Sequence, residues 1–348
     1  MDVGLLDSTD PGWAEALQGV THDVFHAPTY AAWDAAVLGG EAKALVAPLS
    51  VGWLLVPLVV RGVPSQLTAV PKVDGVSPYG YGCPLVSPDV RSSNAEFAGA
   101  LIDAARRCGL VSLFLRSHPL IRMPSFAGVS GATVVEGGKT LGIALSGDLG
   151  PDSRRWSKSL RYEMRRLITA GFLVRHAAWD YLPMFASAYR ETMLRRGASR
   201  RYLFDDAILA RLQEALGPSI VLSVVSDADG GFAAGCLWTC LGQFAHYFLA
   251  ATDDKHARLS PAKLLVAAAA AEAQRCGAQI FHLGGGIGSR QDSLFAFKSS
   301  FADLTFDFTT VRVVVDAQAY AGLEQARATG PMPVAADGFF PSYRAGLE

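Results

Sequence analysis

The chain has 348 residues, of which 50% are hydrophobic and 18% are charged, and its formal net charge is -1. This composition supplies ample material for packed cores and argues against extensive disorder. The near-neutral charge gives no global basicity that would point to nucleic acid. The length predicts two domains of ordinary size or one large domain.

The N-terminus, MDVGLLDSTDPGW, lacks the basic and apolar regions of a secretory signal peptide. The most hydrophobic stretch, residues 44–60, contains Pro48, Gly52 and Pro57, which predicts two buried strands around a turn rather than a membrane helix. The five cysteines are dispersed without C-x-x-C spacing, a pattern typical of reduced core cysteines. We therefore expect a cytoplasmic protein without membrane insertion.

The first half of the chain alternates signals for helices and strands. We expect a helix over residues 29–37, strands over 43–49 and 52–61, a helix over 94–108 and a strand over 110–116. Residues 77–88, SPYGYGCPLVSP, hold the Gly, Pro and Tyr residues that interrupt periodic structure, so they predict a loop. The polar segment LSGDLGPDS, residues 145–153, predicts a linker.

The second half opens with a basic helix over residues 154–171 and a strand over 172–177. Further helices are expected over 181–196 and 205–216, followed by strands over 219–226, 232–241 and 243–252. The first two of these strands are joined by DADGG, a hairpin signal. An alanine-rich helix begins at Pro261, and strands over 279–283 and 304–315 follow it.

The tripeptide Arg-Cys-Gly ends a predicted helix twice, at residues 107–109 and at 275–277. Each copy precedes an apolar strand and then a loop. One tripeptide is a weak signal because Gly commonly ends helices, but the matched order of elements predicts a duplicated domain.

The stretch LGGGIGSRQDSLFAFKSSF, residues 283–301, follows an apolar strand. Consecutive glycines let the backbone approach a ligand closely, although they also suit a turn that binds nothing. Lys298 stands among Phe295, Phe297 and Phe301. It is either a solvated residue beside core phenylalanines or a charged residue that has a function in a pocket.

Other chemical motifs are absent from the sequence. A dinucleotide fingerprint would need a glycine where Ser289 stands, inside a βαβ unit. There is no P-loop, no zinc spacing among the seven histidines, and no G-x-S-x-G nucleophile elbow. We therefore expect no metal site and no bound cofactor.

Taken together, several segments resemble the N-acyltransferase superfamily that includes the GNAT acetyltransferases, and within it the Fem-type, aminoacyl-tRNA-dependent transferases. The most specific part is the Phe-Lys-x-x-Phe pattern at Phe297, Lys298 and Phe301, and the resemblance runs from about residue 20 to 315. The segments are FHAPTYAAW (25–33), SPYGYGCP (77–84), SLRYEMRRLITAGFLV (159–174), YRETMLRRG (189–197), LGGG (283–286) and SLFAFKSSF (293–301).

The resemblance implies the α+β (mixed α/β) class, with two tandem GNAT-like domains, each a mixed, mostly antiparallel sheet flanked by helices. The first domain would cover residues 1–150 and the second, with the transfer site, 151–319, while the C-terminal segment 320–348 would pack back on the first. The implied activity joins an amino acid from aminoacyl-tRNA to the amine of a small acceptor through an amide bond. An acyl-CoA-dependent N-acyltransferase and a non-catalytic binding protein on the same fold stay open as alternatives.

Two departures from related families bear on donor and acceptor. CoA-using GNAT enzymes carry a glycine-rich pyrophosphate loop, but the equivalent segment here, residues 252–265, has no glycine, and Pro261 lacks an amide donor. Peptidoglycan-type members carry a lysine after the N-terminal aromatic motif, whereas none occurs here before Lys43. This favours aminoacyl-tRNA over CoA, and a small acceptor such as a secondary metabolite in antibiotic biosynthesis over a cell-wall precursor.

The resemblance also implies the site residues. Lys298 would stabilise the oxyanion, wedged by phenylalanines, and Tyr247 would lie where the sheet opens to admit the acyl group. Asp292, with His246 and His282 as alternatives, would take the amine proton. The catalytic set is Lys298, Phe297, Tyr247 and Asp292, and the substrate-binding set is Thr192, Arg195, Tyr202, Gly284, Gly285, Gly286, Ser293, Tyr79 and Tyr81.

Residues 154–201 carry twelve Lys and Arg against three acids, a balance of +9. A basic face on a near-neutral protein is expected for phosphate binding, although an amphipathic helix with a solvated face gives the same pattern. The predicted tRNA-binding residues are Arg154, Arg155, Lys158, Arg161, Arg165, Arg200 and Arg201. The oligomeric state is not predicted.

Overall fold

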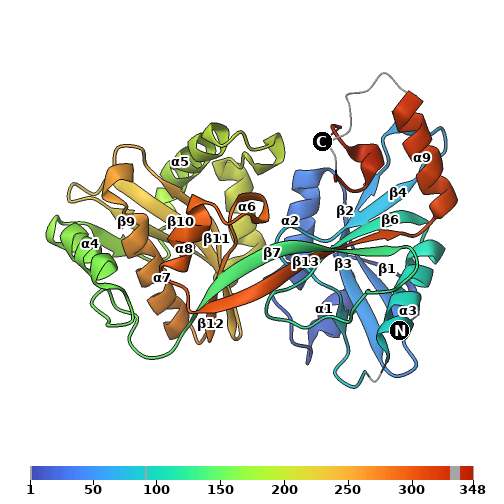
Figure 1. Ribbon diagram of the computed structural model, residues 1–348, viewed down its shortest axis with the longest axis horizontal. Helices are drawn as coiled ribbons and strands as arrows, with labels where there is room; N and C mark the ends of the chain where they lie inside the picture. Colours follow the sequence, from blue (N-terminus) through green and yellow to red (C-terminus); the bar gives the residue numbers. More distant parts are fainter. Residues whose placement is uncertain (1, 91, 330–337, 348) are drawn as a thin grey trace. The chain divides into compact units, whose positions relative to one another are not determined.

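The computed structural model describes residues 2–90, 92–329 and 338–347. It divides into two compact units (Figure 1). Unit 1 comprises Met1–Gly137 with Asp307–Glu348, and unit 2 comprises Gly138–Phe306. The sequence instead placed the boundaries near residues 150 and 319. None of the helices in the described part of the chain has the length and the apolar run that a membrane crossing needs.

Unit 1 is a mixed sheet with helices on both faces. Its sheet has the order β1-β2-β3-β4-β6-β13, with β5 also paired to β3. The strands are β1 (Gly4–Asp7), β2 (Glu41–Pro48), β3 (Trp53–Gly62), β4 (Val73–Val76), β5 (Leu85–Val86), β6 (Leu110–Arg116) and β13 (Leu304–Val314). The helices are α1 (Pro11–Leu17), α2 (Pro28–Leu38), α3 (Asn94–Arg107) and α9 (Ala317–Thr329).

The alternation of side chains along β2 builds two separate cores in unit 1. Leu45 and Ala47 point into the cluster that α3 covers, together with Phe97 and Leu101. Ala44 and Val46 point the other way, into the cluster that α1 and α2 cover. Burial on both faces explains why β2 and β3 read as continuous apolar runs in the sequence.

Unit 2 repeats this plan. Its sheet has the order β7-β12-β11-β10-β9-β8. The strands are β7 (Ala132–Ala144), β8 (Leu173–Arg175), β9 (Ile220–Ser226), β10 (Phe232–Leu241), β11 (Phe244–Thr252) and β12 (Ile280–Gly284). The helices are α4 (Lys158–Thr169), α5 (Leu182–Arg195), α6 (Asp206–Leu216), α7 (Ala262–Arg275) and α8 (Ser293–Ser299).

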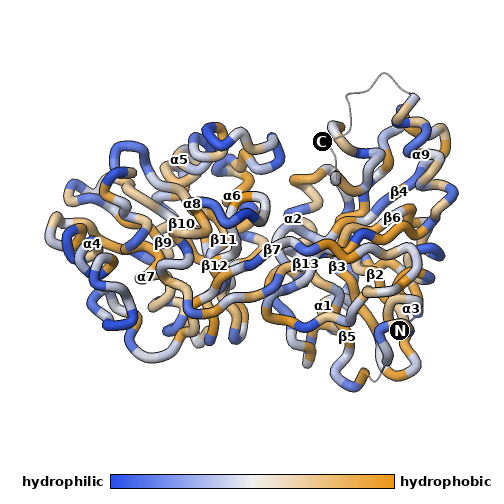
Figure 2. The backbone as a smooth tube through the Cα atoms, viewed as in Figure 1, coloured by the Kyte–Doolittle hydropathy of each residue, from blue (hydrophilic) through white to orange (hydrophobic). Residues whose placement is uncertain are grey.

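Helices cover both faces of the unit 2 sheet. The face bearing Cys236 and Trp238 shares one core with α4 and α7. On the opposite face, α5 packs close at Gly235, where an added Cβ would lie 2.9 Å from the ring of Phe185. Figure 2 shows the strands as mostly hydrophobic and the segment after α5 as hydrophilic.

The two sheets share a topology that supports the predicted duplication. In unit 1 all neighbouring strands are antiparallel except β4 and β6, and α3 leads into β6. In unit 2 all are antiparallel except β11 and β12, and α7 leads into β12. The matched glycines Gly109 and Gly277 end the two helices with φ of 74° and 91°, a conformation that glycine adopts without strain.

The last strand of each sheet comes from the other half of the duplication. Strand β7 follows β6 in the chain but pairs with β12, whereas β13 follows β12 but pairs with β6. The chain therefore passes between the units inside two strands. This explains why the predicted linker at residues 145–153 is wrong: Leu145 and Leu149 are buried in the core of unit 2.

The C-terminal segment packs against unit 1 in the described residues. Tyr320, Leu323 and Tyr343 share a buried cluster with Val63 and Val111. The carboxylate of Asp74 accepts a hydrogen bond from the hydroxyl of Tyr343 at 3.0 Å and is also bound by Arg61 and Arg344. Residues 330–337 and 348 of the predicted segment lie outside the described residues.

Candidate functional site

The glycine stretch forms a turn between β12 and α8, and Lys298 lies in the last turn of α8. The Lys298 ammonium donates a hydrogen bond to the carbonyl oxygen of Gly285 at 2.7 Å. Burial lowers the pKa of Lys298 to about 8; Asp292 opposes this effect and Arg196 adds to it. Lys298 is thus half-buried and bonded to the turn, and its role in the reaction stays a prediction.

The three phenylalanines around Lys298 anchor α8 to the core of unit 2. Phe301 is buried, and its ring meets Trp156 at a centroid distance of 5.7 Å. Phe297 stacks edge to face on Phe301 at 5.5 Å, and Phe295 packs against the same core. These phenylalanines were expected to surround Lys298. They pack α8, the helix that carries Lys298, against the core of unit 2.

Asp292 is the N-cap of α8 rather than a free carboxylate. One oxygen accepts from the N–H of Phe295 at 2.9 Å and the other from the N–H of Ile287 at 3.0 Å. The N–H groups of Phe295 and Ile287 lower the pKa of this carboxyl. Because a general base needs a raised proton affinity, we assign Asp292 to holding the turn instead of taking the amine proton.

The parallel pairing of β11 with β12 ends next to Tyr247, where the sheet was expected to open and admit the acyl group. Its register runs from Phe244 opposite Ile280 to His246 opposite His282, while β11 continues to Thr252. Tyr247 is the next residue, at an irregularity in the β10–β11 register. Its ring packs edge to face on Phe281, and burial raises the pKa of its hydroxyl.

The two histidines at the end of this pairing contact each other. Their Nδ1 atoms are 3.2 Å apart and both side chains are buried. One ring must donate and the other accept, so the pair shares a proton. His282 lies two residues before Gly284, which brings this pair close along the chain to the turn that holds Lys298.

The predicted residues at the end of α5 are tied to one another. Thr192 donates its hydroxyl hydrogen to the carbonyl of Ala188 at 2.8 Å and accepts from Arg195 at 3.3 Å. Arg195 also forms an ion pair with Asp254. The guanidinium of Arg201 lies 4.7 Å from the ring centre of Tyr202. Among the predicted set, Ser293 is the exposed first residue of α8.

In the turn between β11 and α7, many backbone N–H groups are bonded within the protein. This is the segment where a CoA-using enzyme would hold pyrophosphate, and a short 3-10 helix (Ala257–Leu259) occupies it. The N–H groups donate as follows: Asp253 to Ala233 at 3.0 Å, Lys255 to the Asp253 carboxylate at 2.7 Å, His256 to Asp253 at 3.0 Å, Leu259 to His256 at 2.9 Å, Ser260 to Ala257 at 3.1 Å and Lys263 to Ser260 at 3.0 Å. Six backbone N–H groups of this segment are therefore already bonded within the protein.

The predicted tRNA-binding residues divide into two groups. Three are engaged inside the unit: Arg155 with Asp303, Arg165 with Asp152, and Arg161 with the carbonyl of Trp156. Arg154, Lys158 and Arg200 are exposed and make no ion pair within the described part of the chain. The same holds for Arg166, which the prediction left out; Arg201 contacts Tyr202.

Lys158, Tyr162 and Arg166 follow one another at four-residue spacing on the outward face of α4. Tyr162 is 66% exposed. Leu160, Met164 and Leu167 occupy the buried face. The outward face is therefore basic with an exposed aromatic ring at its centre.

Tyr79 and Tyr81 belong to unit 1 and have mainly structural contacts there. The peptide of Tyr79 is held on both sides, by the Asp34 carboxylate at 2.8 Å and by the Tyr30 hydroxyl at 2.7 Å. The ring of Tyr81 packs edge to face on Phe25 at 5.5 Å, and burial raises the pKa of its hydroxyl.

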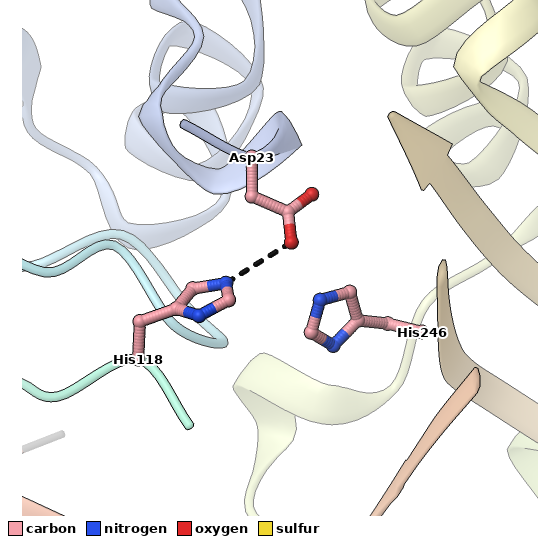
Figure 3. Close-up of side chains that lie close together, drawn as sticks. All are labelled: Asp23, His118 and His246. Carbon is pink, nitrogen blue, oxygen red and sulfur yellow. Dashed lines mark hydrogen bonds and ion pairs between the residues drawn. The ribbon is translucent and has the colours of Figure 1, made fainter. Parts of the chain in front are cut away.

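A buried Asp–His pair lies beside this loop in unit 1 (Figure 3). Nε2 of His118 is 3.0 Å from the Asp23 carboxylate, and its Nδ1 accepts from the N–H groups of Leu120 and Ile121. Because Nδ1 accepts twice, the ring is neutral and Nε2 carries the proton. Both nitrogens are thus engaged, unlike those of a catalytic histidine with a nitrogen open to substrate.

Two features of the site were missed by reading the sequence. The first is α8 itself, although Asp292 three residues before Phe295 is an ordinary N-cap signal. The second is Arg196, whose charge acts on Lys298 from the end of α5. No sequence pattern could have linked these two positions.

Comparison with known proteins gives a family match for part of the chain and fold matches for most of it. The profile described as an acetyltransferase (GNAT) domain matches residues 153–298. FemX superposes with a TM-score of 0.65 at 14% identity, covering 91% of this chain and 99% of that chain. L-PGS from Bacillus licheniformis gives 0.56 at 12% identity, covering 93% and 98%. A comparison with curated protein sequences found no match.

A tandem GNAT protein from the clavulanic acid biosynthesis pathway also superposes, with a TM-score of 0.50 at 13% identity, covering 90% of this chain and 99% of that chain. At such identities the likeness concerns the fold, and it agrees with two GNAT-like units built on one topology. The profile match lies in unit 2 and includes Lys298. Residues 153–298 therefore carry the GNAT acetyltransferase domain of an acyltransferase, and the fold of the whole chain is similar to that of FemX.

Proposed function

We propose that this acyltransferase takes an aminoacyl group from aminoacyl-tRNA and transfers it to the amine of a small acceptor, such as a secondary metabolite. The amine nitrogen attacks the ester carbonyl, a C–N bond forms, and the C–O bond to the terminal ribose of the tRNA breaks. The amine loses a proton and the ribose hydroxyl gains one. The ester is already activated, so the protein has to align the reactants and stabilise the oxyanion.

The observation that carries the choice of donor is the turn between β11 and α7. A CoA pyrophosphate would need its backbone N–H groups, but six of them are already bonded within the protein. An aminoacyl-tRNA presents no pyrophosphate to this segment. The resemblance of the sequence to Fem-type transferases supports the same choice.

Lys298 has the properties that an oxyanion donor needs. It carries a full charge, sits in an apolar environment where that charge is poorly screened, and has a defined position through its bond to Gly285. One of its three ammonium protons is used by that bond, which leaves two for the developing oxyanion.

The outward face of α4 supports an RNA partner. Lys158 and Arg166 can contact phosphates, and the exposed ring of Tyr162 can stack on an unpaired base. The unit therefore offers both a site for the ester and a basic surface for the RNA that carries it.

The test uses hydroxylamine as a small amine that stays uncharged near neutral pH. The protein is incubated with tRNA charged with a labelled amino-acid mixture, and enzyme-dependent hydroxamate is measured above the uncatalysed background. We expect hydroxamate formation that RNase abolishes and that Lys298→Ala reduces about 100- to 1,000-fold. Turnover of acetyl-CoA without any turnover of aminoacyl-tRNA would replace this proposal with an acyl-CoA-dependent transferase.

A further inference from the structure

The two ends of α8 bind two neighbouring peptides of the glycine turn. Near the start of the helix, Asp292 accepts a hydrogen bond from the N–H of Ile287 at 3.0 Å. In its last turn, Lys298 donates to the carbonyl of Gly285 at 2.7 Å. Gly286 lies between these two contacts. The turn is thus clamped by a carboxylate and an ammonium group from one helix.

The turn leaves no room for a side chain at position 286. An added Cβ would lie 2.0 Å from the carbonyl oxygen of Arg290 and 2.5 Å from the Asp292 carboxylate. The φ of Gly286 is -83°, an ordinary value for any residue, so the space and not the backbone conformation requires glycine here. The close approach of the Asp292 side chain to the turn is therefore part of how the turn is built.

Capping α8 explains only half of what Asp292 does. An N-cap needs one oxygen, and in Asp292 that oxygen accepts from Phe295 at 2.9 Å. A serine would serve the same purpose. The second carboxylate oxygen reaches back to Ile287, which contributes nothing to the cap and fixes the turn that Lys298 is bonded to.

We propose that Asp292 is a positioning residue of the transfer site, which acts through Ile287 to hold the glycine turn in the conformation where Gly285 anchors the Lys298 ammonium. The inference rests on the role proposed above for Lys298. Losing the contact to Ile287 lets the turn relax, and the ammonium shifts relative to the reacting carbonyl. A displacement of about 1 Å in such a site costs up to about 100-fold in rate.

Electrostatics give a second, independent readout of the clamp. The charged groups that act on the Lys298 ammonium are Asp292, which raises its pKa, and Arg196, which lowers it. Replacing the carboxylate removes the attraction and leaves the repulsion. Lys298 then titrates at lower pH than in the wild type.

The experiment separates the cap from the clamp by substitution. Asp292→Ser keeps a favoured N-cap but loses the charge and the reach to Ile287, whereas Asp292→Ala loses both functions. Asp205→Ser is the matched control, because Asp205 caps α6 in the same unit by accepting from Ile208 at 2.8 Å. Gly286→Ala disturbs the same clamp from the side of the turn.

Two measurements are made on each variant. Trace labelling with acetic anhydride across a pH series, read by peptide mass spectrometry, gives the titration midpoint of Lys298 without any substrate. Hydroxamate formation from aminoacyl-tRNA and hydroxylamine gives kcat and KM. We expect Asp292→Ser to melt close to the wild type, to lower the Lys298 midpoint, and to lower kcat up to about 100-fold with KM for aminoacyl-tRNA nearly unchanged.

The outcomes are distinguishable. If Asp292→Ser matches Asp205→Ser in both midpoint and kcat, Asp292 is a helix cap only and the inference is overturned. If the wild type forms no hydroxamate from aminoacyl-tRNA, the proposed function fails, but a midpoint that also moves in Gly286→Ala, which keeps the Asp292 charge, still supports the clamp. A lowered midpoint together with a lowered kcat supports both.

Discussion

The pH dependence of transfer tests the role of Lys298 most directly. Burial lowers the pKa of Lys298 to about 8 from the ordinary 10.5. If the ammonium stabilises the oxyanion, the protonated enzyme is the active form. The rate is then level near pH 7 and falls about tenfold per pH unit above pH 8, as expected for the loss of one proton.

The size of the effect follows from the same geometry. Lys298→Ala removes the donor and costs about 100- to 1,000-fold, or about 3–4 kcal/mol of transition-state stabilisation. Lys298→Gln retains a neutral donor, so it keeps part of the rate and loses the fall above pH 8. Arg196→Ala removes a repulsion from the ammonium, so the falling limb moves to higher pH.

The assay is hydroxamate formation between pH 6 and 10, corrected for spontaneous cleavage of the ester at each pH. Hydroxylamine suits this range because it stays uncharged above neutral pH. A rate that rises through pH 8 would refute the reasoning, because it would make the neutral amine of Lys298 a base. If the fall in rate above pH 8 occurs at the same pH in Arg196→Ala as in the wild type, a group other than Lys298 is titrating.

Three further predictions concern stability and binding. Asp74→Ala leaves buried arginines without their carboxylate, so it should cost about 3–5 kcal/mol, read as a lower urea midpoint. Lys158→Gln and Arg166→Gln should each reduce the slope of log affinity for tRNA against log salt by about one, and Tyr162→Ala should weaken binding without changing the slope. Lys298→Met should stabilise the fold at pH 7 by up to about 2 kcal/mol, because the depressed pKa costs about 3 kcal/mol and the lost hydrogen bond offsets part of it. That cost is complete below pH 8 and vanishes above pH 10.5, so the advantage of Lys298→Met in melts should shrink across this window.

Local sequence patterns predicted the strands correctly where buried apolar residues form a continuous run. Strands β6 and β10 have the residues expected of them, because runs such as LVSLFLR and FAAGCLWTCL are bounded by turn residues. Strand β7 was missed because its middle is largely exposed and contains Gly137 and Gly138. Gly137 has a packing reason, since an added Cβ would lie 2.5 Å from the ring of Phe308. That neighbour is 171 residues away in sequence, and no local pattern reveals it.

The sequence predicts the part of the candidate site whose residues are close together in the chain. Lys298 and its phenylalanines stand out in the sequence because a charge among aromatics is unusual. The contacts that define the lysine are less visible, because a bond to the carbonyl of Gly285 depends on the backbone path of the turn. The effect of Arg196 depends on how α5 packs, which is a property of the tertiary structure.

The duplication supports the proposal that the transfer site lies in unit 2. In both units the chain turns directly after the strand that follows the matched helix, and a side chain in the turn accepts backbone N–H groups: His118 from Leu120 and Ile121 in unit 1, and Asp292 from Ile287 in unit 2. In unit 1 the network closes on Asp23, so the imidazole has both nitrogens bonded. In unit 2 the network ends on Lys298, whose ammonium keeps donors to spare and a pKa near 8. The corresponding turn thus carries a hydrogen-bonded Asp–His pair in one copy and a cation in the other, and we propose that this cation responds to charge that develops on a substrate.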